Sequence, residues 1–262
     1  EADPRPRASV DSTPVPPAVV LGVAAVGGFV MLGAEVLWAR VLTFVFGHDT
    51  YAFASLLAIV LVGLALGGFG QRLLTGLTDR LVLSTLPSLL GICLIGGYGA
   101  AVALVVAHGR DPLGLDGSGR LATSPWLELA RELVLTPVLV LPPAIVAGAL
   151  LPAACAALSR GRADPGRRVG AVVLANGVGS TLGAVSVSAM LGSLVGLHDA
   201  FRLLAVLSAT GGAAVALLVR RGRGRPIAAL APLGAIAVAL LCLPPALPRR
   251  LLLAAVGPRH QT

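Results

Sequence analysis

The chain has 262 residues, of which 56% are hydrophobic and only 12% are charged. A soluble domain carries roughly a quarter of its residues as charged side chains, so this composition excludes a water-soluble globular protein. The net charge is +8 and all 20 basic residues are arginine, but these arginines lie in short loops between apolar runs, so we interpret them as a topology signal and expect no nucleic-acid partner.

The apolar runs are about 20 residues long, as expected of membrane-spanning helices, and they do not alternate with polar residues. Because lipid offers no hydrogen-bond partners, a chain that crosses the bilayer must satisfy its backbone within helices or a closed barrel. The run length and the missing alternation favour helices over barrel strands. We therefore predict an all-α fold, a polytopic transmembrane helix bundle of about seven spans, with the lipid bilayer as its main partner.

In chain order, the sequence divides into three regions. Residues 1–17 are polar and proline-rich, and they predict a disordered N-terminal segment. Residues 18–243 are predicted to form the transmembrane helical domain, and residues 244–262 a C-terminal tail or a linker to a missing domain. The predicted spans are Ala18–Trp38, Tyr51–Phe69, Leu81–Ala107, Leu133–Leu158, Val169–Val195, Ala200–Val219 and Ile227–Leu243. Between the third and fourth spans we expect a polar loop at 108–124 and a short interfacial helix at 125–132, where Trp126 suits the headgroup level.

The placement of arginine predicts the orientation. With alternating spans, the two densest clusters, at 160–168 and 220–225, fall on the same side as the N-terminus. Cytoplasmic loops carry an excess of arginine, so we predict a multi-pass protein of a bacterial inner (cytoplasmic) membrane with a cytoplasmic N-terminus. Seven spans would place the C-terminus on the opposite side.

Two ionisable residues mark the end of the first predicted span. Glu35 is a candidate functional residue because ionisable groups at membrane depth are costly. Its alternative role is to reach the interface, where we also expect Trp38 to lie. Arg40 follows five residues later, which is about 140° around a helix, so we do not expect a direct ion pair between Arg40 and Glu35.

Three further polar residues are candidates. His48 and Asp49 lie in the turn between the first and second predicted spans. Asp49 is a good N-cap for the second helix, and we favour this capping role over a ligand site. Asn176 lies within the fifth predicted span, where an amide commonly hydrogen-bonds to another helix.

The fourth predicted span contains the adjacent prolines Pro142 and Pro143. They remove two backbone donors, so we expect this helix to be kinked or broken. Broken helices line binding sites in transporters, whereas kinks are also common in ordinary membrane bundles. Both interpretations stay open at this point.

Glycines four residues apart predict close helix packing, at Gly63 and Gly67, at Gly179 and Gly183, and at Gly192 and Gly196. The second pair lies in the segment GVGSTLG (177–183). This segment lacks the glycine at the sixth position of the dinucleotide-binding pattern, so we interpret it as a packing surface and not as a nucleotide loop.

The sequence contains no complete catalytic site. Cys93, Cys155 and Cys242 each lie within an apolar run without a neighbouring Cys or His, as is typical of small buried residues. The sequence shows no activated nucleophile motif, no paired intramembrane carboxylates and no metal-ligand spacing. We therefore assign no catalytic residue, no cofactor and no metal to this chain.

Four segments carry a family resemblance. The first two are GAEVLWARVLTFVFGHDTYAF (33–53) and LLAIVLVGLALGGFGQRLL (56–74), and the others are PPAIVAGALLPAACAAL (142–158) and GRRVGAVVLANGVGSTLGAV (166–185). Together they resemble the N-terminal membrane domain of bacterial spermidine synthase-like proteins, which are membrane-bound polyamine aminopropyltransferases. The loop residues Asp79 and Arg80 are also similar to a loop of major-facilitator transporters.

The resemblance implies that the membrane helices precede a soluble, Rossmann-like transferase domain of polyamine biosynthesis. Such a domain moves an aminopropyl group from decarboxylated S-adenosylmethionine to putrescine. Its glycine-rich cofactor loop and its catalytic acid are absent from this chain, so no catalytic residue is carried over. The resemblance therefore does not decide whether this chain is part of an enzyme.

We therefore expect this chain to anchor a catalytic domain, either C-terminal or separate, and the segment 243–262 resembles the junction to such a domain. The alternatives are a small-solute transporter-like bundle and a structural subunit of a membrane complex. The sequence does not specify the oligomeric state.

Overall fold

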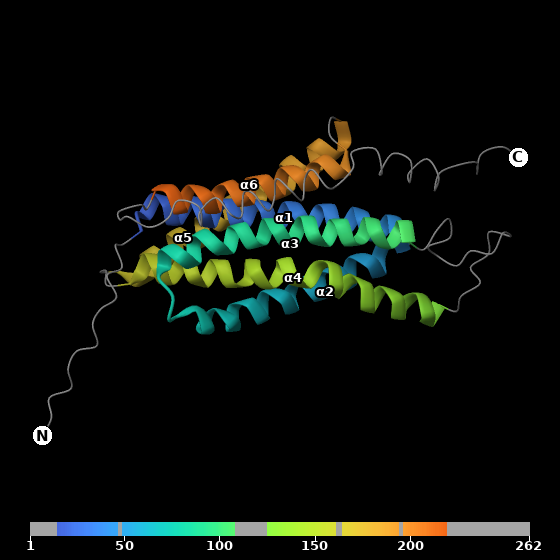
Figure 1. Ribbon diagram of the computed structural model, residues 1–262, viewed down its shortest axis with the longest axis horizontal. Coiled ribbons are helices and arrows are strands. Elements are labelled where there is room, and N and C mark those ends of the chain that lie inside the picture. The colour runs from blue at the N-terminus through green and yellow to red at the C-terminus, as the bar shows by residue number, and fades with distance from the viewer. Residues whose placement is uncertain (1–14, 47–48, 108–124, 161–163, 194–195, 219–262) are drawn as a thin grey trace, which may run out of the picture.

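The computed structural model describes residues 15–46, 49–107, 125–160, 164–193 and 196–218, and within these ranges it contains helices and no strands. Figure 1 shows the long helices lying side by side along a common direction. The helices are α1 (Pro17–Phe46), α2 (Asp49–Gly70), α3 (Asp79–Ala107), α4 (Pro125–Ser159), α5 (Pro165–Ser193) and α6 (Leu197–Leu218), with a short 3-10 helix, η1 (Gln71–Leu74), after α2.

All six α-helices are long and apolar enough to cross a membrane. The predicted all-helical membrane bundle is therefore confirmed, with six spans. The seventh predicted span, Ile227–Leu243, lies outside the described residues, as do the polar loop at 108–124, residues 1–14 and the tail 244–262. At the end of the predicted disordered segment 1–17, Val15 is buried and Pro17 already begins α1.

Two predicted boundaries are wrong. The segment 125–132 is not a separate interfacial helix, because α4 runs without interruption from Pro125 to Ser159. The first span was predicted to end at Trp38, yet α1 continues two further turns to Phe46. The single charge of Arg40 ended the apolar pattern but not the helix, since the next residues are again apolar.

The prolines of α4 do not break it. Pro142 and Pro143 lie inside one continuous helix. The expectation was a kinked or a broken helix, and only the kink is compatible with this continuity. Figure 1 shows the N-terminal part of α4 inclined to the rest. Pro143 leaves the carbonyl of Leu139 without its helical donor. That carbonyl faces Gly97 of α3, where a Cβ would lie 2.7 Å from it. Helix α3 thus packs against the Leu139 carbonyl that Pro143 leaves without a donor, and such packing by a neighbouring helix is how membrane bundles tolerate internal proline.

Glycine brings the helices together in two parallel pairs. On α5, Gly179 lies against the backbone of Ala25 and Gly183 against that of Phe29, so residue numbers rise together along α1 and α5. On α2, Gly67 lies against the backbone of Ile145. These contacts confirm that the first two predicted glycine pairs are packing surfaces and that GVGSTLG is part of a helix. In the third predicted pair, a Cβ at Gly196 would meet nothing within 4 Å.

The same mechanism joins α2 to α4. Gly63 lies against Ala144, and Gly148 of α4 lies against the backbone of Leu64. Residue numbers again rise together, so this pair is also parallel. Small residues at helix interfaces let the backbones approach closely, which drives association where lipid removes the hydrophobic effect.

The remaining pair, α3 with α6, is antiparallel. Ser208 Oγ donates a buried hydrogen bond to the carbonyl of Pro87 (2.6 Å), and the Arg80 guanidinium donates to the carbonyl of Ala216 (3.1 Å). Gly212 of α6 meets Ser88 and the backbone of Ser84. Polar groups in this pair therefore bond across the helices, as expected inside a membrane bundle.

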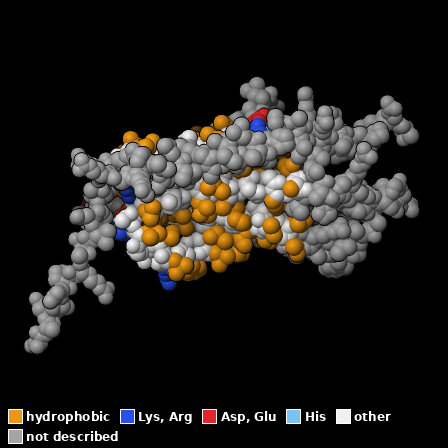
Figure 2. All heavy atoms as spheres, viewed as in Figure 1, with side chains coloured by type: hydrophobic (Ala, Val, Ile, Leu, Met, Phe, Trp, Pro, Cys, Tyr) orange, Lys and Arg blue, Asp and Glu red, His pale blue; other side chains and the backbone are white. Residues whose placement is uncertain are grey.

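The outer faces of α2 and α5 are apolar and exposed. In Figure 2 apolar side chains cover the middle of the visible face, and charged side chains lie toward its ends. Such a belt suits contact with lipid. The exposed residues include Phe53, Leu57, Leu61, Leu66 and Phe69 on α2 and Val173, Leu174, Val178, Leu182 and Val185 on α5.

Candidate functional site

The candidate site is a partly open cavity of about 340 Å³ between α1, α2, α4 and α5. This volume falls within the range of small-molecule sites. Three polar side chains line the cavity: Glu35 from α1, and Asn176 and Ser180 from α5. The rest of the lining is apolar or glycine. Two polar candidates from the sequence, 141 positions apart, therefore meet at one site.

Glycine on α1 makes room for the polar side of this cavity. A Cβ at Gly28 would lie within 3.0 Å of the Asn176 carbonyl oxygen, Asn176 Oδ1 and Ser180 Oγ. Because Gly28 has no side chain, α5 can bring both polar residues up to the α1 backbone. A substitution at Gly28 would displace α5 or remove these oxygens from the cavity.

Glu35 lies inside the span and not at its end. The helix α1 extends eleven residues beyond it, to Phe46, which is about 16 Å at the helical rise of roughly 1.5 Å per residue. The side chain lines the cavity and has no hydrogen-bond or ion-pair partner among the described residues. Trp38, three residues on, is fully buried against Phe201 (ring centroids 5.0 Å apart), and its place at the membrane interface stays a prediction.

The other sequence candidates do not join this site. Arg40 is exposed and, over the described part of the chain, pairs with no carboxylate, so the expectation of no Glu35–Arg40 ion pair holds there. Pro142 and Pro143 lie outside the cavity, whose proline is Pro152. His48 lies outside the described residues. Asp49 begins α2, but its side chain is not described, so the capping role stays a prediction.

Asn176 does not make the expected interhelical hydrogen bond within the described ranges. Its Oδ1 lies instead at the cavity wall beside Gly28. Ser180, which the sequence analysis missed, lies one turn further along the same face of α5. The signal was available, since residues four apart on a helix share a face, but serine is also common in membrane helices without any ligand role.

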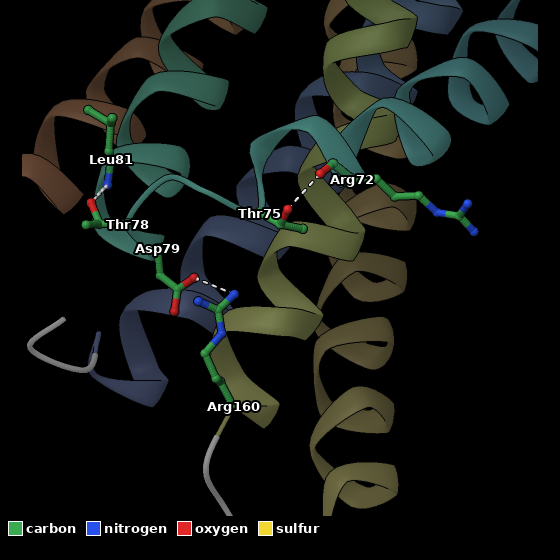
Figure 3. Close-up of polar contacts among 6 residues, drawn as sticks. All are labelled: Arg72, Thr75, Thr78, Asp79, Leu81 and Arg160. Carbon is green, nitrogen blue, oxygen red and sulfur yellow. Dashed lines mark hydrogen bonds and ion pairs between the residues drawn. The ribbon is translucent and has the colours of Figure 1, made fainter. Parts of the chain in front are cut away.

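A second polar cluster lies where α3 begins and α4 ends. Figure 3 shows the ion pair between Asp79 and Arg160, whose Oδ1 and Nη2 atoms are 3.1 Å apart. Nearby, Thr75 Oγ1 donates to the Arg72 carbonyl (2.8 Å), and the backbone N–H of Leu81 donates to Thr78 Oγ1 (3.4 Å), which caps α3. The cluster ties the α2–α3 connection to the end of α4.

An aromatic cluster fills the bundle near the start of α6. Tyr98 stacks on Phe201 (centroids 4.6 Å apart) and lies 5.4 Å from the ring of His198. His198 is buried, and neither of its ring nitrogens has a hydrogen-bond partner among the described residues. Its ring lies against Tyr98 in the core, so we interpret the cluster as core packing.

The donor set of the cavity defines its chemistry. A carboxylate, an amide oxygen and a hydroxyl oxygen accept hydrogen bonds and can hold an ammonium group or a proton. Within the described ranges no three His, Cys, Asp or Glu side chains group as metal ligands would.

No protein-family model, no curated protein and no solved structure matches this chain.

Proposed function

We propose that this chain is a membrane-embedded amine-binding bundle, the membrane domain of a spermidine synthase-like protein, and that the cavity at Glu35 is its binding site. The observation that carries the proposal is the unpartnered carboxylate of Glu35, which lines a cavity in the middle of the bundle. An amine is the ligand class whose charge and hydrogen-bond donors complement this site.

The physical reason is the cost of a carboxylate inside a membrane. Ionisable groups there usually face a cavity and pair with another group, since an unpaired charge in low dielectric is strongly disfavoured. An ammonium ion supplies the opposite charge and up to three N–H donors. Glu35 Oε atoms, Asn176 Oδ1 and Ser180 Oγ are the acceptors that would receive them.

The positions of the resembling segments support the family assignment. The segment 33–53 includes Glu35, the segment 142–158 includes Gly148 and Pro152, and the segment 166–185 includes Asn176 and Ser180. All these residues line the cavity. The motifs that suggested the family thus surround one place in the fold, as motifs that preserve a binding site would.

The proposal includes a topology. Ile227–Leu243 forms a seventh span, the arginine-rich segment at 160–168 faces the cytoplasm, and the protein lies in a bacterial inner membrane. A catalytic domain follows the bundle or joins it as a separate chain. An open reading frame of domain length beyond the codon for Thr262, with a glycine-rich loop after a strand, would support this arrangement. A stop codon there would leave only the separate-chain version.

Equilibrium binding tests the site. We expect purified protein in nanodiscs to bind putrescine or spermidine, and the Glu35→Gln variant to lose at least tenfold in affinity. Asp164→Asn is the matched control, because Asp164 is exposed at the start of α5 and lies outside the cavity. Equal binding by Glu35→Gln and the unchanged protein would refute the role of Glu35.

Transport is a second candidate function, and one observation favours it. The cavity lies between two glycine-packed pairs, α1 with α5 and α2 with α4. A site between two such units is the arrangement in which one unit can rock against the other to open either side. Reconstituted liposomes would show Glu35-dependent uptake of putrescine if the bundle transports it. Binding without uptake would leave the anchoring and substrate-handling role.

A further inference from the structure

We propose that the cavity opens sideways into the bilayer, between α2 and α5, and that its ligand is a lipophilic amine, an ammonium head on a hydrocarbon chain. The inference rests on the proposed amine-binding function and specifies its substrate class. It also changes the route of the ligand, which arrives from the hydrocarbon layer and not from the water on either side.

The first observation is the depth of the cavity. Its lining on α1 runs from Ala24 to Glu35, which is centred on the middle of the span Pro17–Thr43. Ala24 lies seven residues from Pro17, about 10 Å at the helical rise. The cavity is only partly enclosed, and its lining lies at hydrocarbon depth.

The second observation locates the opening. Within the described residues, α1 packs on α5 and α2 packs on α4, and the pairs meet through α1 and α4, whereas α2 and α5 do not pack on each other. Helices α1 and α4 therefore form the floor of a groove, and α2 and α5 form its two walls.

The walls pass directly into the outer surface. On α2, Val60 and Leu64 line the cavity, and Leu61, which lies between them in the sequence, is 58% exposed. Leu61 follows Val60 by one residue, about 100° around the helix, so the lining of α2 passes at the same level into the exposed face.

The same relation holds on α5. Asn176 and Ser180 line the cavity, and Val173, which precedes them by three and seven residues, is 49% exposed. Gly177 also faces open space, because nothing lies within 4 Å of a Cβ built there. The groove is therefore bordered along its length by Leu61 on one wall and by Gly177 on the other, with Val173 about one turn before Gly177 on the same wall.

The third observation is the chemistry of the lining. Among the described residues that line the cavity, Glu35 is the only ionisable one, and the remainder is mainly Leu, Val, Ala, Met and Gly. A single carboxylate complements a single ammonium head, and apolar walls complement a hydrocarbon chain. A diamine brings a second charge for which the described lining holds no second carboxylate, so we expect it to bind more weakly than a monoamine of the same length.

The groove has one competing occupant within the chain. Ile227–Leu243 is an uncharged apolar run that could pack over the mouth as a seventh helix. In that case no ligand could enter between α2 and α5. We favour the open mouth because the groove presents the Glu35 carboxylate, whereas this run contains no ionisable group other than the thiol of Cys242 and therefore cannot complement that charge.

The test uses radiolabelled alkylamines and the full chain in phosphatidylcholine nanodiscs, with protein-free discs subtracted. We expect decylamine to bind more tightly than 1,10-diaminodecane, which has the same chain length. Each added methylene from hexylamine to decylamine should raise apparent affinity about fourfold on the aqueous concentration scale, because it raises the concentration of amine in the bilayer. Affinity expressed per lipid should stay constant along the series.

Two tryptophan variants test the mouth. Val173→Trp should lower decylamine affinity at least tenfold by closing the groove, whereas Leu182→Trp, on the opposite exposed face of the same helix, should leave it unchanged. Both positions are exposed, and size-exclusion profiles would verify folding. Equal affinity in the two variants would overturn sideways access. So would capture of the segment 227–243 by a photo-crosslinking residue at position 173.

The result separates this inference from the proposed function. Glu35-dependent binding of putrescine or spermidine without binding of decylamine would overturn the lipophilic ligand and leave amine binding intact. Absence of Glu35-dependent binding for every amine tested would overturn both.

Discussion

The contact between Gly179 and Ala25 makes the sharpest stability prediction. A Cβ at position 179 would lie under 3.0 Å from three backbone atoms of Ala25, and a backbone cannot move aside as a flexible side chain can. Gly179→Ala should therefore push α1 and α5 apart. Two residues away on the same helix, a Cβ at Gly177 meets nothing within 4 Å, so Gly177→Ala is the matched control.

The magnitude follows from comparing the two variants. Each substitution gains the same helix propensity, about 1 kcal/mol for Gly to Ala, so this contribution cancels in their difference. What remains is the overpacking at the α1–α5 contact, about 1–3 kcal/mol. We expect Gly179→Ala to unfold at lower SDS mole fraction than Gly177→Ala, with a difference of this size in unfolding free energy measured by circular dichroism in mixed micelles. Equal stability of the two variants would refute the claim that glycine is required at this contact.

Four further outcomes are expected. Gly68 lines the cavity, and a Cβ there would meet only the Gly148 carbonyl at 3.8 Å, so Gly68→Val should keep or slightly raise the unfolding free energy and lower amine affinity at least tenfold; unchanged affinity would place the ligand elsewhere. Ser208→Ala removes the buried hydrogen bond to the Pro87 carbonyl and should cost about 0.6–1.5 kcal/mol by SDS titration, whereas Thr210→Ala, exposed on the same helix, should cost less. A double-mutant cycle on Asp79 and Arg160, whose side chains are 21% and 51% exposed, should give a coupling of about 1 kcal/mol or less that weakens with salt; a larger coupling would show a role beyond a surface ion pair. Reporter fusions after residue 17 and after Leu218 should report the same side of the membrane, because six spans separate them; opposite sides would mean that one of these helices does not cross.

The spans were predictable because a membrane helix needs only length and apolar composition. Their boundaries were less so. Arg40 interrupts the apolar run, but a single charged residue near a membrane surface can extend outward without ending the helix. The segment 125–132 looked separate because Glu128 and Glu132 lower its hydropathy, although nothing in it opposes continuation into α4. Hydropathy reports the position of the lipid, while helix ends depend on local backbone partners.

The candidate site was predictable in part. Glu35 and Asn176 stood out because polar groups at membrane depth are costly. That they line one cavity depends on the register between α1 and α5, which Gly28, Gly179 and Gly183 set by backbone contact. Many glycines in this chain have no such role, and Gly22, Gly70 and Gly96 face open space. Sequence alone does not tell which glycines meet a neighbouring helix.

Close packing and the cavity have a common origin in the distribution of glycine. Gly179 and Gly183 on one pair, and Gly63 and Gly67 on the other, bring backbones into contact along the outer sides of α1 and α4. The cavity lining carries four further glycines, Gly27, Gly28, Gly68 and Gly148, of which Gly68 has the most room, because a Cβ there would meet only the Gly148 carbonyl at 3.8 Å. An apolar bundle would ordinarily close such a space with Leu or Ile, since interiors pack densely. The cavity therefore lies where the two tightly packed pairs meet, beside the open space at Gly68, and Glu35 is the one ionisable side chain among the described residues that line it.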